Sequence, residues 1–148
     1  MEVPEIRKAQ LSDLEKIMEI EAQSFREESF NIRQMRYLLK SENLFLVAEN
    51  QQQLAAYMIL LSKKNSAVLR IYALAVAEKF RGIGLAKRML NNAIALANKR
   101  DLSKVSLEVK AVNYTAIKIY KSLGFKVVKE LPAYYKDGTT ALKMELSL

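Results

Sequence analysis

The sequence predicts a mixed α/β domain in which helices cover both faces of a sheet of about seven strands. Apolar residues recur at two different periods, one typical of strands and one typical of helices. The strand-like runs form an antiparallel series before residue 77 and alternate with helical segments after it. Glycine and proline are scarce, with 4 and 2 residues among 148, so regular elements should fill one domain, residues 1–148.

The first half of the chain is expected to form a strand, two helices and an antiparallel meander. A short strand at residues 5–9 precedes a helix that should begin at Ser12, with Glu15 completing a capping box. A second helix should begin at Asn31, with Gln34 as its reciprocal cap. Polar turns separate three further strands, expected at residues 43–49, 54–61 and 68–76.

The second half is expected to alternate helices and strands. An apolar stripe predicts a long helix from Leu85 to about Lys99, followed by a strand at residues 105–109. The next helix should be capped by Asn113 and stopped by Gly124 in a left-handed conformation. Two final strands flank a hairpin tip and are expected at residues 125–128 and 139–146. The predicted order is β-α-α-β-β-β-α-β-α-β-β.

Composition excludes several kinds of chemistry. The chain has no cysteine, which excludes disulfides and a Cys nucleophile, and no histidine, so Glu, Asp, Tyr, Lys or water must act as acid and base; no metal is expected. The net charge of +8 suits a nucleic acid, a ribosome, an acidic peptide or a phosphorylated cofactor, and a solvated lysine-rich surface explains it equally. No signal-type core or membrane-length apolar run is present, so a cytoplasmic location without a membrane partner is expected.

A glycine-containing junction connects the expected strand at residues 68–76 to the long helix. Unpaired backbone N–H groups and the positive end of the helix dipole meet there and favour a phosphate, although a plain surface turn is the alternative. The chain lacks Gly-Lys-Ser/Thr, which excludes a Walker P-loop, and Lys87 replaces the third glycine of a dinucleotide motif. The junction consists of Arg81, Gly82, Ile83, Gly84, Leu85, Ala86 and Lys87.

The pattern Arg81-x-x-Gly84-x-Ala86 resembles the Q/R-x-x-G-x-G/A pyrophosphate motif of the GNAT superfamily of acetyltransferases. Residues 107–125 resemble the signature of ribosomal-protein-alanine N-acetyltransferases and related N-terminal acetyltransferases. The resemblance covers essentially the whole chain. It implies an acetyl-CoA-dependent N-acetyltransferase that acts on a primary amine, with a protein N-terminus as the expected acceptor. Residues 25–30 lack the Trp-Pro pair of many relatives, which leaves a ribosomal protein substrate open.

The resemblance also implies which residues hold acetyl-CoA. In this superfamily the cofactor lies between two parallel strands, here residues 68–76 and 105–109. A backbone N–H of the first strand would polarise the thioester carbonyl, which is an oxyanion-hole effect. Residues 82–87 would hold the pyrophosphate, with Arg81 as part of the motif. The remaining implied donor-binding residues are Leu74, Ala75, Val76 and Asn113.

Glu108 stands out from the residues alone, because it lies in a strand expected to be covered on both faces, where a carboxylate is costly unless it is paired or functional. An ion pair with Lys110 or Arg70 is the structural alternative. The resemblance implies that Glu108 is the general base, directly or through water, and that Tyr120 protonates the CoA thiolate. Core packing is the alternative for Tyr120, which should share a helix face with Asn113.

Four further residues are candidates for the acceptor site, and for each of them ordinary packing is the alternative. Tyr134 and Tyr135 precede the hairpin tip, and neighbouring strand residues face opposite ways, so at most one should face the substrate. Glu21 and Phe25 lie late in the first helix. Two other functions remain: a GNAT enzyme that acetylates a polyamine or aminoglycoside-like amine, and a non-catalytic nucleic-acid or ribosome-binding module. The lysines are spread along the sequence, so direct nucleic-acid contact is not expected.

Overall fold

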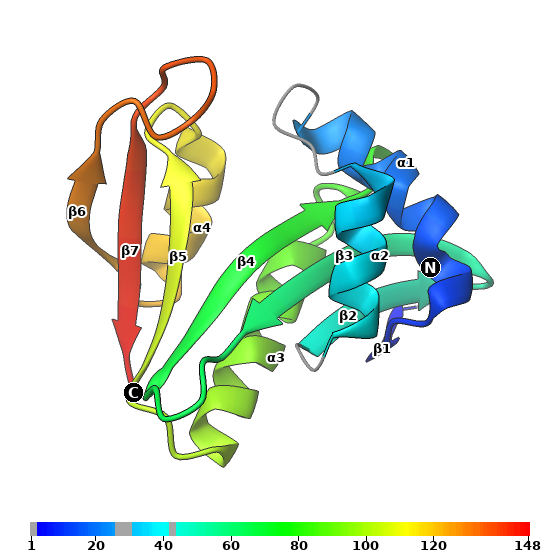
Figure 1. Cartoon of the computed structure of the whole chain (residues 1–148), viewed down its shortest axis with the longest axis horizontal. Coiled ribbons are helices and arrows are strands. Elements are labelled where there is room, and N and C mark those ends of the chain that lie inside the picture. The colour runs from blue at the N-terminus through cyan, green and yellow to red at the C-terminus, as the bar shows by residue number, and fades with distance from the viewer. Residues whose placement is uncertain (1–2, 26–30, 42–43) are drawn as a thin grey trace. The chain divides into compact units, whose positions relative to one another are not determined.

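The computed structural model describes residues 3–25, 31–41 and 44–148, and its elements follow the predicted order (Figure 1). Seven strands are arranged as β1-β2-β3-β4-β5-β7-β6, which confirms the mixed α/β class. The bounds are β1 Glu5–Lys8, α1 Leu14–Phe25, α2 Ile32–Lys40, β2 Leu44–Asn50, β3 Gln53–Leu61, β4 Val68–Val76, α3 Leu85–Lys99, β5 Lys104–Lys110, α4 Tyr114–Ser122, β6 Lys126–Leu131 and β7 Ala141–Ser147, with short 3₁₀ helices η1 Leu11–Asp13 and η3 Glu78–Phe80.

The chain divides into two compact units. Unit 1 comprises Met1–Leu61 and Ala73–Met89, and unit 2 comprises Ser62–Tyr72 and Leu90–Leu148. Strand β4 and helix α3 therefore contribute residues to both units. None of the helices described in either unit combines the length and the apolar character that a membrane crossing needs.

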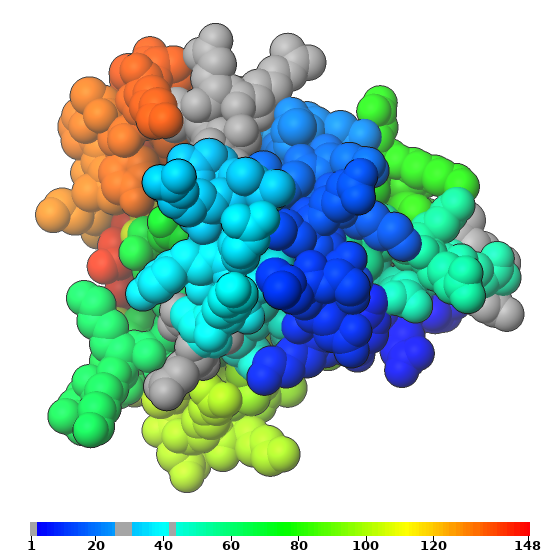
Figure 2. Space-filling view, turned by 45° about the vertical axis from the view of Figure 1, so that its right-hand side comes forward, coloured from blue at the N-terminus to red at the C-terminus, as the bar shows by residue number. Residues whose placement is uncertain are grey.

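Unit 1 is built on the antiparallel strands β1, β2 and β3. A two-residue turn joins β2 to β3, and its residues Gln51 and Gln52 have φ values of 51° and 68°, the left-handed geometry that suits the twist of a hairpin. Helix α1 buries Ile17 and Ile20, and Figure 2 shows α1 and α2 side by side on the surface of this unit. Helix α1 packs against both α2 and β3, and residues 54–60 of β3 are all buried.

The start of α2 was predicted correctly and the start of α1 was not. Asn31 accepts a hydrogen bond from the Gln34 backbone N–H, and Gln34 accepts one from the Asn31 N–H, each at 2.9 Å. Ser12 instead lies inside η1, and the Gln10 N–H donates to the Asp13 carboxylate at 2.7 Å. Asp13 holds this turn because it also forms charge-assisted bonds of 2.9 Å with Arg7, which a serine cannot provide.

Unit 2 is built on the first part of β4 and on β5, β7 and β6 (Figure 1). The parallel ladder runs from the Val68–Lys104 pair to the Ile71–Leu107 pair, and β7 pairs antiparallel with both β5 and β6. Alternation along β5 gives it an apolar face with Leu107 and a polar face that carries Ser106, Glu108 and Lys110. The polar face is the one that carries the predicted base.

The strand β6 begins and ends later than the predicted residues 125–128. Phe125 is buried beside Tyr120 instead, with ring centroids 6.0 Å apart, and so belongs to the connection after α4. Gly124 ends α4 as predicted, with φ of +100°. A Cβ there would stand 3.0 Å from the Leu146 side chain, so both the backbone conformation and the packing favour glycine.

Candidate active site

The junction between β4 and α3 exposes a run of backbone N–H groups. The first helical bond is donated by the Arg88 N–H to the Gly84 carbonyl at 3.1 Å. The N–H groups of residues 82–87 have no acceptor among the residues that the structure describes. Gly82 and Gly84 have φ values of +81° and +82°, and a Cβ on either would meet nothing within 4 Å. The loop therefore presents donors and the positive end of the helix dipole toward open space, as an anion site requires.

Two of the cations near this loop are anchored to the protein. Arg81 donates from Nε to the Val76 carbonyl at 3.0 Å and from Nη2 to the Ser24 hydroxyl at 3.3 Å. Arg88 donates to the Pro4 carbonyl. Arg81 thus ties the loop to the end of β4 and to α1, all within unit 1. Lys87 is exposed and pairs with no described residue, so its charge is available to an anionic ligand.

The predicted strand segment lies in the same unit as the loop. Ala75 is buried, while Leu74 and Val76 are half-buried. The chain then turns at Ala77, whose N–H donates to the Ala55 carbonyl at 2.8 Å, and this bond fixes the exit of β4 against β3. Any hydrogen bond from residues 74–76 to a ligand would use the main chain, because these side chains are apolar.

Glu21 lies in the interior of unit 1. Its side chain has no exposed surface and accepts a hydrogen bond from the hydroxyl of Tyr57, which is also fully buried. Burial raises the pKa of Tyr57 well above its ordinary value, and the neighbouring Glu21 carboxylate adds to this effect. Phe25, the last residue of α1, is half-buried. The predicted acceptor roles of Glu21 and Phe25 stay predictions, and residues 26–30 lie outside the described residues.

Glu108 is held by an arginine on the neighbouring strand. Its Oε2 atom lies 3.1 Å from Nε of Arg70, and the two side chains are 16% and 37% exposed. The same guanidinium donates from Nη2 to the Tyr134 hydroxyl at 3.4 Å and lies over the Tyr72 ring, 5.3 Å from its centroid. The structure therefore joins Glu108 and Tyr134, two predicted site residues, through Arg70, which the sequence indicated only as a possible ion-pair partner.

The loop between β6 and β7 is anchored by a second ion pair. Lys110 lies 3.1 Å from Asp137 and over the ring of Tyr135, 5.1 Å from its centroid. Asp137 also accepts a hydrogen bond from the Thr139 N–H at 2.9 Å. The Thr139 hydroxyl also donates to Asp137 and has the largest effect on its pKa. Together with the bonds from the Thr139 N–H and Lys110, it lowers the pKa of Asp137 to about 2. The ring of Tyr134 packs edge-on against the ring of Tyr135, with their centroids 5.0 Å apart, so the two side chains stabilise each other's position.

Helix α4 positions Asn113 and Tyr120. The Asn113 side chain caps the helix by accepting a hydrogen bond from the Ala116 N–H at 3.2 Å, which leaves its amide NH₂ for other partners. Tyr120 is half-buried, and burial raises its pKa to about 12. Its phenol therefore stays protonated at neutral pH, which is the state that a proton donor requires.

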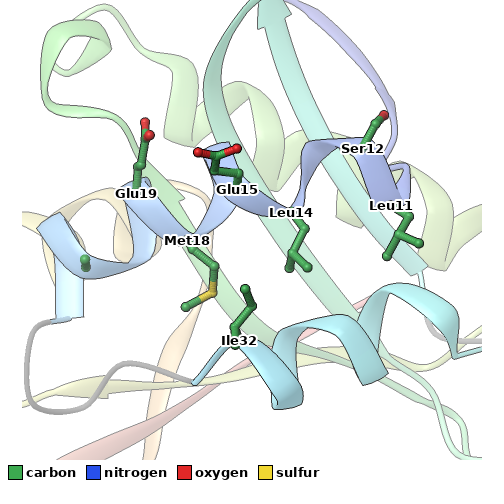
Figure 3. A pocket seen from close by; sticks show the side chains of 8 residues that line it. Leu11, Ser12, Leu14, Glu15, Met18, Glu19 and Ile32 are labelled. Atoms are coloured by element: carbon green, nitrogen blue, oxygen red, sulfur yellow. The ribbon is translucent and has the colours of Figure 1, made fainter.

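A shallow hollow in unit 1 contains none of the predicted site residues. Apolar side chains of α1 and α2, including Met18 and Ile32, form its floor, while Glu15 and Glu19 stand at its rim (Figure 3). Within residues 3–25, 31–41 and 44–148, no group of three or more His, Cys, Asp or Glu side chains could hold a metal ion.

Comparison with known proteins identifies the family. The family model described as the acetyltransferase (GNAT) domain matches residues 8–148. The chain belongs to the GNAT family of acetyltransferases. It is 30% identical to the N-alpha-acetyltransferase of Sulfolobus acidocaldarius over 97% of this chain and 92% of that protein. The family match and this relative together show that the chain is an N-acetyltransferase.

Solved structures of GNAT enzymes share this fold. Ard1 of Thermoplasma volcanium superposes with a TM-score of 0.89 at 26% identity, over 99% of both chains. The ribosomal-protein-S18-alanine N-acetyltransferase of Escherichia coli superposes with a TM-score of 0.87 at 25% identity, over 97% of this chain and 93% of that one. The predicted superfamily and fold are thereby confirmed, while the individual site residues stay predictions.

Proposed function

We propose that this GNAT enzyme transfers acetyl from acetyl-CoA to the α-amino group of a protein N-terminus in the cytoplasm. The run of unpaired N–H groups at residues 82–87 carries the donor half of the proposal, because it fits a pyrophosphate and faces open space. The acceptor half rests on the relatives that match nearly the whole chain. One of them is named N-alpha-acetyltransferase. Another, from Bacillus subtilis, is named putative ribosomal protein bS18-alanine N-acetyltransferase. It is 29% identical over 97% of this chain and 95% of that protein.

In the proposed donor site, residues 82–87 bind the pyrophosphate through their N–H groups, and Lys87 adds a positive charge. A main-chain N–H of residues 74–76 stabilises the negative charge that develops on the carbonyl oxygen, an effect typically worth about 3–4 kcal/mol. The Asn113 amide donates a further hydrogen bond. Acetyl-CoA itself supplies an activated thioester, so a covalent enzyme intermediate is unnecessary, in keeping with a chain that has no cysteine and no histidine.

In the proposed reaction the amine nitrogen forms a bond to the acetyl carbon, and the carbon–sulfur bond breaks. Glu108 takes the proton that the amine loses, directly or through water, and Tyr120 gives a proton to the sulfur of the leaving thiolate. Glu108 then releases its proton to solvent and Tyr120 regains one from solvent, so the enzyme is restored and the products are an N-acetyl amine and CoA thiol. Such proton transfers typically contribute roughly 10²–10⁴-fold to the rate.

The proposal is tested with purified protein, acetyl-CoA and a set of peptides that carry free N-termini, with mass spectrometry locating the acetyl group. Glu108→Gln should lower kcat by roughly 10²-fold or more while leaving acetyl-CoA affinity nearly unchanged. Wild-type turnover in this variant would show that Glu108 is only the partner of a structural ion pair.

A further inference from the structure

The net positive charge of the chain arises entirely from unit 2. Unit 1 contains 11 Lys and Arg residues and 11 Asp and Glu residues, and is neutral. Unit 2 contains 13 Lys and Arg residues against 5 Asp and Glu residues, which equals the +8 of the whole chain. Of the 13 basic residues of unit 2, three lie in residues 62–72 and ten in residues 90–148. The residues assigned to acid–base chemistry therefore lie in a strongly basic unit.

Every described carboxylate near Glu108, on the polar face of β5 and β7 or in the loop between β6 and β7, is already paired. Glu108 pairs with Arg70 at 3.1 Å. Asp137 pairs with Lys110 at 3.1 Å. Glu145, on β7, pairs with Lys104 at 3.2 Å and also approaches Lys143, at 3.8 Å. Among the described residues, this face consequently offers no unpaired carboxylate to an incoming polycation.

Arg70 still has hydrogen-bonding capacity after these contacts. Its Nε and Nη2 atoms are engaged by Glu108 and Tyr134, and Nη1 has no partner within the described chain. A guanidinium carries five N–H donors in a planar fork that matches a carboxylate. Lys136, exposed two residues after Tyr134, also has no described partner. Free donors and free positive charge thus surround the residues proposed to receive the acceptor.

We propose that Arg70 is a specificity-determining residue, which makes the enzyme prefer N-terminal peptides with Asp or Glu in their first residues over basic peptides and polyamines. This inference rests on the proposed function. Arg70 neutralises Glu108 in the free enzyme and offers its remaining N–H donors to an acidic side chain of the acceptor. A polyamine finds no unpaired carboxylate among these described residues and meets the positive field of unit 2.

The test compares acceptors under identical conditions with the wild-type enzyme. Three peptides share one sequence and differ only in carrying Glu, Gln or Lys at the second and third positions, and spermidine serves as the polyamine. The expected kcat/KM falls in the order Glu, Gln, Lys peptide, with about tenfold or more between the first and last and spermidine lowest. Raising the ionic strength should narrow this range, because exposed charges are screened.

Variants then assign the preference to Arg70. In Arg70→Gln the ratio of kcat/KM between the Glu and Lys peptides should fall about tenfold, and in Arg70→Lys it should fall less, because the charge is kept and the fork is lost. Arg100→Gln is the matched control: it removes one exposed arginine of the same unit, and the ratio should not change. The ratio is independent of any common loss of rate, and a thermal melt checks that each variant is folded.

Three outcomes decide the inference. Preference for the Glu peptide that disappears in Arg70→Gln and persists in Arg100→Gln supports it. Equal rates on the three peptides overturn it while leaving N-terminal acetylation intact. Acetylation of spermidine in preference to every peptide overturns both the inference and the proposed acceptor.

Discussion

At the scale of single residues, Glu108 and Tyr120 are controlled by different physical effects. Glu108 is held by an ion pair with Arg70, so its orientation depends on a neighbouring strand. Tyr120 is governed by burial, which keeps its phenol protonated with a pKa of about 12. The roles proposed for them are opposite, with Glu108 as the proton acceptor and Tyr120 as the proton donor.

Tyr120→Phe should remove the proton donor without disturbing the fold. The phenyl ring keeps its contact with Phe125, so the melting temperature should change little. We expect kcat to fall by roughly 10²-fold with acetyl-CoA affinity nearly unchanged, because proton donation acts only in the transition state. Steady-state kinetics together with acetyl-CoA titration measure both quantities. An unchanged kcat would show that Tyr120 is a packing residue.

The pH dependence of kcat offers a separate test of Tyr120. Because burial raises its pKa from the ordinary 10.0 to about 12, the proton is lost only at higher pH than in an exposed tyrosine. We therefore expect no decline in kcat between pH 8 and about pH 10.5 that can be assigned to this phenol. A decline with a midpoint near 10 in the wild type, absent from the residual activity of Tyr120→Phe, would contradict the buried environment.

At the scale of elements, patterns among neighbouring residues predicted the helices and strands well, whereas contacts between elements were difficult to predict. The apolar stripe predicted α3 with the bounds observed, Leu85–Lys99. This succeeded because the helical period is visible in the spacing of apolar residues within one segment. The start of α1 was mispredicted because Asp13 accepts a hydrogen bond from Arg7, which lies in β1. The bond between Arg70 and Glu108 depends on the register of β4 and β5, so the sequence could present it only as one of two options.

The glycine loop should respond to Gly84→Ala in two separable ways. Its φ of +82° is unfavourable for alanine, so the free energy of unfolding should fall by about 1–2 kcal/mol. The added methyl group would also face the open side of the loop, where the pyrophosphate is proposed to lie, so acetyl-CoA affinity should fall about tenfold. Calorimetry gives the affinity, and denaturant unfolding gives the stability.

Gly138→Ala is the matched control for this variant. Gly138 has the same φ of +82° and equally open surroundings, but it lies in the loop between β6 and β7. It should lose similar stability and keep its acetyl-CoA affinity. Equal losses of affinity in the two variants would show that general destabilisation, and not the loop, explains the effect.

At the scale of the whole molecule, two compact units share one strand and one helix. Residues of β4 and α3 belong to both units, so neither can lose these elements without affecting the other. The predicted single domain should then unfold in one transition, with near- and far-ultraviolet circular dichroism giving the same midpoint. Saturating acetyl-CoA at about 100 times its Kd should add about 2.7 kcal/mol of stability. Two separate midpoints would show that the units unfold independently.

Product analysis on peptides is the sharpest test of the proposal that this GNAT enzyme acetylates the α-amino group of protein N-termini. Wild-type protein, acetyl-CoA and a mixture of peptides are incubated, and tandem mass spectrometry locates the acetyl group while a thiol reagent measures released CoA. We expect acetylation at the α-amino group, with one CoA released for each acetyl group transferred. Acetylation confined to lysine side chains or to added spermidine, with every peptide N-terminus unmodified, would contradict it.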